Sequence, residues 1–328
     1  GVAGFLGSHL ADLMISEGHT VAGNDNMIGG YTDNVPQNVE FYQVDCCDLE
    51  NMTKAMEGCD IVYHTAATAY EGLSVFSPVL VTRNIFEASV TTITAAIRNK
   101  VKRIVYCSSM ARYGHHDKLP YKEDYECRPQ DPYGIAKKAG EDVLRNLCDT
   151  HGVEYVIAVP HNIVGPRQKY DDPFRNVMSI MLNRMLQGKQ PIIYGDGKQQ
   201  RCFSYIDDCL YCLNALAFQD NVVGEVINIG PDEEPITIIK LAEACANETG
   251  LNLNPIHHDD RPKEVKLAVC SSDKARQLLG YKTSTNMRQS VKKTAEYIRT
   301  RGTKKFQYHL PLEIVNDKTP DTWKKKLI

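Results

Sequence analysis

The chain has 328 residues, of which 42% are hydrophobic and 24% are charged, and its formal net charge is −3. These values are typical of a globular protein with a large core or two lobes, and without a basic excess we do not expect it to bind nucleic acid. Its apolar stretches are too short to cross a bilayer, so no membrane association is expected.

Apolar runs alternate with amphipathic runs through the first half of the chain. The predicted elements are, in order, a helix at 8–17, a strand at 20–23, a helix at 48–58, a strand at 61–63, a helix at 78–100, a strand at 103–108, a helix at 132–150 and a strand at 155–159. This alternation predicts an α/β fold with a parallel sheet covered on both faces. We therefore expect a doubly wound Rossmann domain over residues 1–160.

The rhythm changes after residue 160, where segments are shorter and richer in Pro, Gly and Asp. Helices are predicted at 176–186, 208–218, 236–249, 273–279 and 286–300. We expect residues 161–328 to form mainly a smaller α/β substrate-binding lobe, partly interleaved with the first domain. The stretch at 304–328 carries Trp323 and a lysine run, and is predicted to be a surface arm with a solvated, charged end.

Cysteine usage indicates a reducing compartment. The chain has 11 cysteines, an odd number, and they show no paired metal-ligand spacing. We expect reduced thiols in a cytoplasmic protein, and no metal site.

Three glycines predict a phosphate-binding loop. Gly1, Gly4 and Gly7 are followed directly by the first predicted helix, so the backbone can approach a pyrophosphate while the helix N-terminus offers free N–H groups. Alone, the pattern could be a structural turn. Since such a loop normally follows a strand, we expect the native protein to have a strand upstream of Gly1.

Asp25 stands 18 residues after Gly7, at the end of the next predicted strand. Its carboxylate can accept hydrogen bonds from the ribose hydroxyls of adenosine, and it would repel the 2′-phosphate of NADP. The alternative is an Asp that only forms a turn. In this context the sequence predicts NAD as the cofactor.

Tyr133 and Lys137 are four residues apart on a predicted helix, hence on one face. A neighbouring ammonium and a cationic nicotinamide ring would lower the pKa of the phenol, which is normally about 10, and make Tyr133 a general base. A lone Tyr-x-x-x-Lys pair is usually only a helix surface. Ser109, at the end of a predicted strand, supplies a second hydroxyl and makes a catalytic trio the better interpretation.

Together these features resemble the extended short-chain dehydrogenase/reductase family, and within it the UDP-galactose (UDP-glucose) 4-epimerase group. The resemblance includes Asp45-Cys46, Ala66-Ala67 and Asn84. It extends to three motifs of the second half, which are His161-Asn-Ile-Val-Gly-Pro-Arg-Gln168, Tyr194-Gly-Asp-Gly-Lys-Gln-Gln-Arg201 with the residues up to Asp208, and Asp260-Arg261-Pro-Lys-Glu-Val265. It covers residues 1 to about 300 and not the tail.

The resemblance implies two binding sites in addition to the trio. The residues implied to bind NAD are Gly1, Gly4, Phe5, Leu6, Gly7, Asp25, Asn26, Asp45, Cys46, Ala66, Ala67, Asn84, Tyr133, Lys137 and Pro160. The residues implied to bind a nucleotide sugar are Ser109, Asn162, Asn176, Ile192, Tyr194, Arg201, Arg261 and Ala268. The guanidinium groups of Arg201 and Arg261 suit a diphosphate. Ile192 and Tyr194 are expected to flank the base.

In the implied reaction Tyr133 removes a proton from the sugar 4-hydroxyl while hydride passes to NAD. The 4-keto sugar turns over, and hydride returns to its other face. The resemblance thus implies an NAD-dependent epimerase with a UDP-sugar as the expected partner. It also implies a homodimer, formed through the helices at 78–100 and 132–150.

Other functions stay open at this point. A 4-dehydrogenase or 4-keto reductase would use the same trio but release its cofactor. A 4,6-dehydratase needs an acid pair after the serine, where this chain has Met110 and Ala111, and a decarboxylase usually has a Glu near Ala111. A non-catalytic NAD-binding scaffold would have no need of the trio.

Two further positions bear on the substrate. Arg112 stands where the group has a small apolar residue, and either contacts a charged substrate or faces solvent, which we favour. Ala268, aligned on Arg261, falls where the pocket faces the sugar 2-substituent. Its small side chain predicts that 2-acetamido sugars are accepted, unless it simply packs in a strand.

Overall fold

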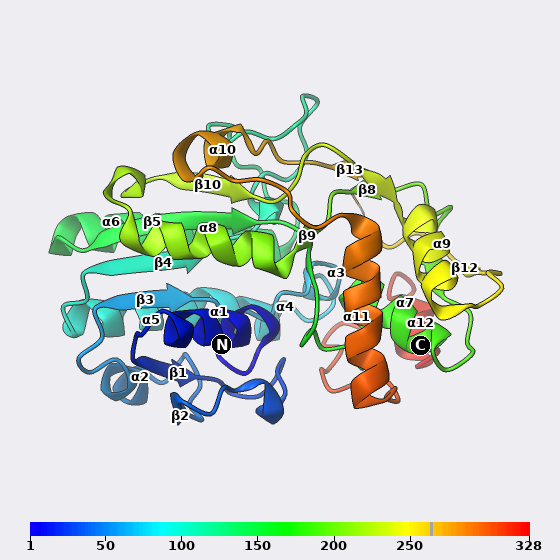
Figure 1. Cartoon of the computed structure of the whole chain (residues 1–328), viewed down its shortest axis with the longest axis horizontal. Helices are drawn as coiled ribbons and strands as arrows, with labels where there is room; N and C mark the ends of the chain where they lie inside the picture. Colours follow the sequence, from blue (N-terminus) through cyan, green and yellow to red (C-terminus); the bar gives the residue numbers. More distant parts are fainter. Residues whose placement is uncertain (263–264) are drawn as a thin grey trace.

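The computed structural model describes residues 1–262 and 265–328 (Figure 1). Its central layer is a parallel sheet, with strands in the order β10 (Val226–Ile229), β5 (Glu154–Pro160), β4 (Arg103–Cys107) and β3 (Ile61–His64). A second parallel pair, β1 (Val21–Asn24) with β2 (Val39–Tyr42), lies on the β3 side of this layer. The predicted α/β fold with a parallel sheet is confirmed, whereas β2 and β10 are strands that the sequence did not predict.

Helices cover both faces of the sheet. Helices α1 (Phe5–Ser16) and α8 (Ile206–Phe218) pack together on one face, and α5 (Ala88–Arg98) and α6 (Pro132–His151) lie on the other, with α2 (Leu49–Ala55) beside α5 (Figure 1). Among the described residues, no helix combines the length and apolarity that a bilayer crossing requires. The doubly wound arrangement brings the carboxyl ends of the strands to one edge of the sheet.

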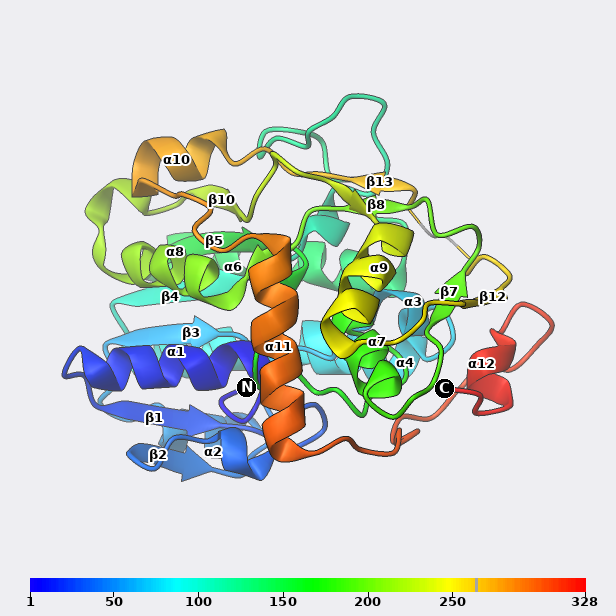
Figure 2. The same cartoon turned by 45° about the vertical axis from the view of Figure 1, so that its right-hand side comes forward.

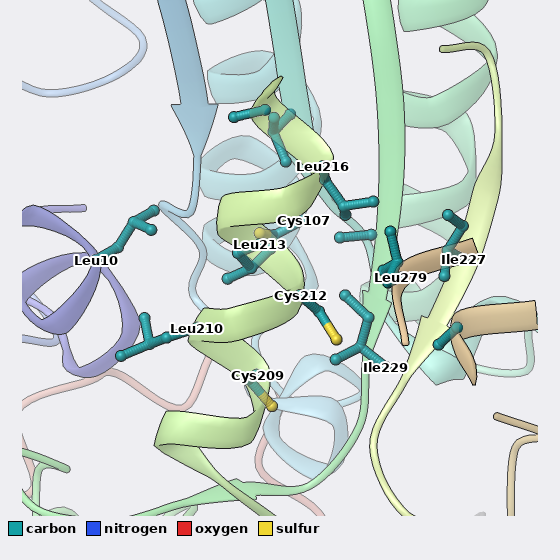
Figure 3. Close-up of a cluster of buried hydrophobic side chains, with 14 of the residues drawn as sticks. Leu10, Cys107, Cys209, Leu210, Cys212, Leu213, Leu216, Ile227, Ile229 and Leu279 are labelled. Atoms are coloured by element: carbon teal, nitrogen blue, oxygen red, sulfur yellow. The ribbon is translucent and has the colours of Figure 1, made fainter. Parts of the chain in front are cut away.

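The largest hydrophobic cluster lies between α8 and the sheet (Figure 3). Cys209, Leu213 and Leu216 of α8 recur at helical spacing and are 0% exposed, so this face of the helix is directed at the core. Ile229 of β10 and Leu279 of α10 (Asp273–Leu279) complete the contact. All eleven cysteines are free thiols, and those of α8 act as small hydrophobic residues.

The long helix predicted at 78–100 contains a π-helical turn. The chain runs through α4 (Pro78–Thr82), a π turn at Arg83–Glu87 and α5 without leaving the helix. Such turns often occur at functional sites. This one carries Asn84, whose side-chain amide donates to Thr68 Oγ1 at 3.0 Å and holds the loop after β3.

The second lobe lies at the carboxyl ends of the strands (Figure 2). Three helices share its core, which are α7 (Val177–Met185), α9 (Ile238–Thr249) and α11 (Met287–Arg301). Two small sheets border them, made by β7 (Ile192–Tyr194) with β12 (Ile256–His258), and by β8 (Gln200–Arg201) between β11 (Ile236–Thr237) and β13 (Leu267–Ala268). Because α8, β10 and α10 return to the first sheet, residue 160 marks where the lobe begins and not where the sheet domain ends.

The final stretch of the chain packs against the body of the protein. Trp323, on the short helix α12 (Asp321–Lys324), is 2% exposed, and its ring lies 6.0 Å from that of Phe76 and 5.5 Å from that of Phe174. The prediction of a surface arm is therefore wrong for Trp323, because the aromatic ring finds an apolar partner cluster. The end of the lysine run, Lys325 and Lys326, is exposed.

A buried ion pair lies behind the end of β4. Arg112 Nη2 donates to Glu141 Oε2 at 2.9 Å, and the two residues are 3% and 0% exposed. Ser108 Oγ donates to the other oxygen of the same carboxylate at 2.5 Å. The expectation that Arg112 faces solvent is wrong, because its charge is needed against the buried carboxylate of α6.

Arg112→Met is expected to lower the free energy of unfolding by about 3 kcal/mol, because the carboxylate of Glu141 stays buried after its main partner is removed. Arg145, at 3.4 Å, compensates only in part. Urea unfolding measures the change. The double variant Arg112→Met/Glu141→Gln should recover most of the loss, since neither charge remains. A single variant as stable as the wild type would contradict a buried, charged pair.

Candidate active site

A cavity of about 530 Å³ lies where the carboxyl ends of the strands meet the second lobe. Its wall is formed by the glycine loop, the ends of β1, β3 and β4, the start of α6, and strands β7, β8 and β13. All the residues implied to bind NAD or the nucleotide sugar line it, which are Gly1, Gly4, Phe5, Leu6, Gly7, Asp25, Asn26, Asp45, Cys46, Ala66, Ala67, Asn84, Ser109, Tyr133, Lys137, Pro160, Asn162, Asn176, Ile192, Tyr194, Arg201, Arg261 and Ala268. The fold thus brings two sets of residues, distant in sequence, into one enclosure.

The glycine loop requires the absence of side chains. A Cβ on Gly7 would lie 2.1 Å from the carbonyl oxygen of Gly1, and one on Gly4 would lie 3.1 Å from the same oxygen. Helix α1 begins at Phe5, and its first turn has no acidic residue. Its N-cap is Gly4, which has no side chain that could bond the first N–H groups. The first N–H groups of α1 and its positive dipole end are therefore available to an anion.

Two carboxylates stand at the end of β1. Asp25 is 7% exposed, and its two oxygens accept the N–H groups of Ala3 at 3.0 Å and Met27 at 2.8 Å. A carboxylate has about four acceptor positions, so Asp25 can accept further donors. Asn26 Nδ2 donates to Asp45 Oδ2 at 3.2 Å, which places a second acid nearby. Acids at this point suit a free ribose and oppose an additional phosphate.

Ser109, Tyr133 and Lys137 come together at the junction of β4 and α6. Ser109 follows β4, and its hydroxyl accepts the N–H of Ala111 at 3.2 Å. It also lies close enough to the hydroxyl of Tyr133, on the first turn of α6, to act on the pKa of that phenol. Lys137 lies one turn further along, and its Nζ donates to the carbonyl oxygen of Cys107 at 2.7 Å. The spacing predicted from the sequence thus corresponds to one compact group.

The pKa of Tyr133 differs from the sequence-based expectation. Burial raises the pKa of this phenol to about 12, while the hydrogen bond of Ser109 and the charge of Arg175 act in the opposite direction. The expectation that Lys137 lowers this pKa does not hold in the protein alone, because burial outweighs the neighbouring charges and the ammonium is directed at Cys107. Ionising Tyr133 therefore needs further positive charge in the cavity.

Lys137 is held in an unfavourable environment. It is 2% exposed, and burial lowers the pKa of its ammonium to about 8, against the opposing effects of Cys107 and Glu141. The side chain is fixed by its bond to the end of β4 and cannot extend into solvent. The protein thus spends stability to keep a cation beside Tyr133.

The two predicted asparagines hold the loops that wall the cavity. Asn162 and Asn176 have left-handed backbones, with φ of 45° and 72°, a conformation that Asn tolerates. Asn162 Nδ2 donates to the carbonyl oxygen of Cys202 at 2.9 Å. Asn176 Oδ1 accepts from Gln168 at 2.9 Å, and its Nδ2 donates to the carbonyl oxygen of Lys169 at 3.1 Å. These bonds are a role that the resemblance did not include.

Two arginines reach the cavity from the second lobe. Arg201 on β8 pairs in register with Ala268 on β13. The guanidinium of Arg261 lies 4.9 Å from the ring centre of Tyr194. Ile192 and Tyr194 are two residues apart on β7, so their side chains lie on the same side of the strand. Residues 263 and 264, which belong to the motif that starts at Asp260, lie outside the described residues.

Other polar residues of the cavity were not found from the sequence. Tyr70 donates to Asp172 Oδ2 at 2.5 Å, and the guanidinium of Arg175 lies 5.4 Å from the Tyr70 ring centre. Arg175 and Glu71 influence the pKa of Tyr133 in opposite directions. The sequence feature that could have indicated them is the charged segment that follows the Gly-Pro-Arg motif at 165–167.

This combination of a Rossmann sheet, a glycine loop and a Ser-Tyr-Lys trio defines an NAD-dependent enzyme of the short-chain dehydrogenase/reductase type. The model of the NAD dependent epimerase/dehydratase family matches residues 1–230, and the chain belongs to this family. The chain is thus an enzyme of the NAD-dependent epimerase and decarboxylase type.

Several relatives are similar over most of their length. The chain is 28% identical to UDP-glucose 4-epimerase of Mycolicibacterium smegmatis, covering 92% of this chain and 98% of the relative. It is 30% identical to UDP-N-acetyl-alpha-D-glucosaminuronate decarboxylase of Bacillus cytotoxicus, covering 71% and 74%. The crystal structure of UDP-glucose 4-epimerase from Thermotoga maritima with UDP-glucose matches with a TM-score of 0.86 at 30% identity, covering 92% and 97%. The family predicted from the sequence is confirmed.

NAD is the cofactor of this family, and the cavity has groups that fit it. The free start of α1 and the close backbone of Gly7 would hold the pyrophosphate, Asp25 would bind the adenosine ribose, and Lys137 would reach the second ribose. When bound, NAD supplies the acceptor and donor of hydride.

Lys137→Met is expected to stabilise the protein near neutral pH while removing activity. In the wild type the pKa of the ammonium falls from 10.5 to about 8 on folding, so the unfolded chain binds the proton more tightly than the folded chain. The free energy of unfolding of the wild type therefore rises as the pH increases from 8 to 10.5. The variant should be more stable by about 1–3 kcal/mol at a pH of about 7, after the lost Cys107 hydrogen bond is included. Urea unfolding should show the gain shrinking at high pH; a variant less stable than the wild type near neutrality would refute this.

Proposed function

We propose that the protein is an NAD-dependent nucleotide-sugar 4-epimerase, which inverts C4 of a UDP-sugar through a transient 4-keto sugar. The supporting observation is that Ser109, Tyr133 and Lys137 share one cavity with Arg201 and Arg261. The trio alone would suit any oxidation of an alcohol, whereas two guanidinium forks suit a diphosphate. The UDP-glucose 4-epimerases among the similar proteins support UDP as the nucleotide.

In this proposal Tyr133 and Ser109 act on the 4-oxygen of the sugar, while Lys137 is placed to hold the second ribose of NAD. Tyr133 accepts the hydroxyl proton as C4 becomes a ketone, and Ser109 donates a hydrogen bond to the same oxygen. The charge of Arg175 favours the phenolate, and the cationic nicotinamide ring of bound NAD would supply the further positive charge that Tyr133 needs. Arg201 and Arg261 hold the diphosphate while the sugar ring turns, and Tyr133 then returns the proton to the 4-oxygen of the inverted sugar.

Two alternative reactions lack their acid and base. Dehydration removes water from neighbouring carbons, and the positions after Ser109 that would supply the groups hold Met110 and Ala111, which cannot exchange protons. The Glu typical of decarboxylases near Ala111 is replaced as well. A 4-dehydrogenase or 4-keto reductase would use the same trio, and differs in releasing its cofactor at each turnover.

We also propose a homodimer formed through α4, α5 and α6. Val79 on α4 and Ile135 on α6 are 71% and 54% exposed, and these helices pack against each other. A second copy would cover both side chains.

Tyr133→Phe is expected to reduce C4 inversion by about 10²–10⁴-fold, because the variant loses the group that carries the proton. NMR of UDP-glucose, UDP-galactose and their 2-acetamido counterparts follows the configuration at C4, and fluorescence titration measures NAD binding, which should be unchanged. Tyr42→Phe, at a half-buried tyrosine whose hydroxyl bonds Glu40, is the matched control. Inversion at the wild-type rate by Tyr133→Phe would exclude the proposed base.

We propose further that the substrate range includes 2-acetamido sugars. Ala268 is 5% exposed, lines the cavity and pairs with Arg201, which we assign to the diphosphate. A methyl group at this place leaves space for an N-acetyl group next to the diphosphate-bearing carbon.

Ala268→Tyr is expected to lose activity on 2-acetamido sugars selectively, because the phenol ring would occupy the space of the acetamide and overpacking costs roughly 1–3 kcal/mol. Rates on paired 2-hydroxy and 2-acetamido substrates give the ratio, and Ala268→Ser is the control of similar size. An unchanged ratio in Ala268→Tyr would remove this residue from the pocket wall.

A further inference from the structure

Residues 303–328 form an arm that joins both halves of the protein. Beyond α11 the arm passes α7, where Asn183 Nδ2 donates to the carbonyl oxygen of Lys304 at 2.9 Å, and then the loop before α7, where Gln307 N–H donates to the carbonyl oxygen of Asp171 at 2.8 Å. It then reaches the start of α4, where Glu313 accepts the N–H groups of Val79 and Leu80, each at 2.9 Å. Its last part forms α12, which lies near β7 (Figure 2). The arm therefore bridges the sheet domain and the second lobe beside the cavity.

The arm makes a direct polar contact with the wall of the cavity. Thr322, on α12, is 0% exposed, and its Oγ1 lies 2.6 Å from the hydroxyl oxygen of Tyr194 on β7. Its carbonyl oxygen accepts the hydroxyl of Tyr308 at 3.2 Å, which fixes α12 to the rest of the arm. Tyr194 is a cavity residue, so the arm holds one of the side chains that face the ligand.

The arm also supports the neighbouring arginine. Arg261 lies with its guanidinium 4.9 Å from the Tyr194 ring centre. A Cβ built on Gly72 would lie 3.4 Å from Arg261 Nη1 and 3.5 Å from Trp323 Cη2. The tyrosine, the guanidinium, the glycine backbone and the indole thus follow one another as a packed series. Ile328, further along the arm, itself lines the cavity.

We propose that the arm is part of the nucleoside-diphosphate subsite and that Thr322 is a positioning residue, which acts on the ligand through Tyr194. This inference rests on the proposed function, in which Tyr194 flanks the base and Arg261 binds the diphosphate. A buried hydroxyl pair between the arm and β7 fixes the orientation of the Tyr194 ring, whereas apolar packing alone would leave it free to rotate. Less side-chain entropy is then lost when the ligand binds, because Tyr194 and Arg261, which lies on the face of its ring, are already ordered.

Thr322→Val tests this, because valine keeps the shape of threonine and removes the hydroxyl. The affinity for UDP, measured by calorimetry on the full chain, should fall about three- to tenfold, as expected for the loss of one buried hydrogen bond. NAD affinity should be unchanged, since its predicted site lies on the sheet domain. Thr322→Ser, which restores the hydroxyl, should recover the affinity.

Thr319→Val is the matched control within the same arm. Thr319 is 2% exposed, and its hydroxyl donates to the carbonyl oxygen of Ile314 at 3.3 Å, away from the cavity. The two variants should show a similar loss in melting temperature, but only Thr322→Val should weaken UDP binding. If both variants lower the affinity for UDP equally, or if Thr322→Val keeps the wild-type affinity, the arm only stabilises the fold and the inference is wrong.

The pair with Tyr194 supplies a second criterion. Tyr194→Phe should weaken UDP binding to the same extent as Thr322→Val, and the double variant should be no worse than either, because both remove one interaction. Effects that add would overturn the positioning role. Arg201→Ala distinguishes failure of the proposed function from failure of the arm inference. If UDP affinity is unchanged in Arg201→Ala, the proposed function fails. If Arg201→Ala abolishes UDP binding while Thr322→Val leaves UDP affinity at the wild-type value, only the arm inference fails.

Discussion

The hydrogen bond from Lys137 Nζ to the carbonyl oxygen of Cys107, at 2.7 Å, is the contact on which the geometry of the site depends. It ties the first turns of α6 to the last residue of β4. Because Ser109 follows that strand and Tyr133 precedes Lys137 by one turn, this bond sets the position of both hydroxyl groups. A shift of α6 along the sheet would separate the two hydroxyl groups and break up the acid–base group.

The site is built at a cost in stability. Burial lowers the pKa of Lys137 and raises the pKa of Tyr133 to about 12. It therefore disfavours both the ammonium of Lys137 and the phenolate of Tyr133, which are the charged forms that proton transfer requires. The ion pair of Arg112 with Glu141 lies directly behind, and Ser108 links it to the strand that carries Ser109. Buried charges are thus concentrated where β4, α6 and the cavity meet, as is common at functional sites.

Local patterns in the sequence predicted the elements of the sheet domain well, because its strands and helices bury regular faces. β1, β3, β4 and β5 carry apolar runs between helices with clear periodicity. β2 was not predicted, because its segment, Val39–Tyr42, is short, half-polar and paired on one side only. Trp323 appeared to belong to a solvated tail because its partners, Phe76 and Phe174, are distant in sequence.

The sequence predicted which residues share the cavity, but not the burial or the pKa of some of them. Spacing and resemblance identified residues that share one cavity, since motif residues are fixed by backbone geometry. The direction of the Tyr133 pKa and the burial of Arg112 depend on packing by distant elements, which no local pattern contains. The same is true of Arg175, which reaches the site from a loop of the second lobe without any motif of its own.

The central claim, inversion of C4 through hydride return, is tested most directly by running the reaction in D₂O on UDP-glucose, UDP-galactose and their 2-acetamido counterparts, with NMR of the sugar ring. The C4 hydrogen leaves and returns without meeting solvent, and no carbon next to the ketone needs to lose a proton. The account therefore predicts inverted C4 with no deuterium at C3, C4 or C5. Deuterium at C3 or C5 would indicate chemistry at the neighbouring carbons, and deuterium at C4, or no inversion of any of these sugars, would contradict the account.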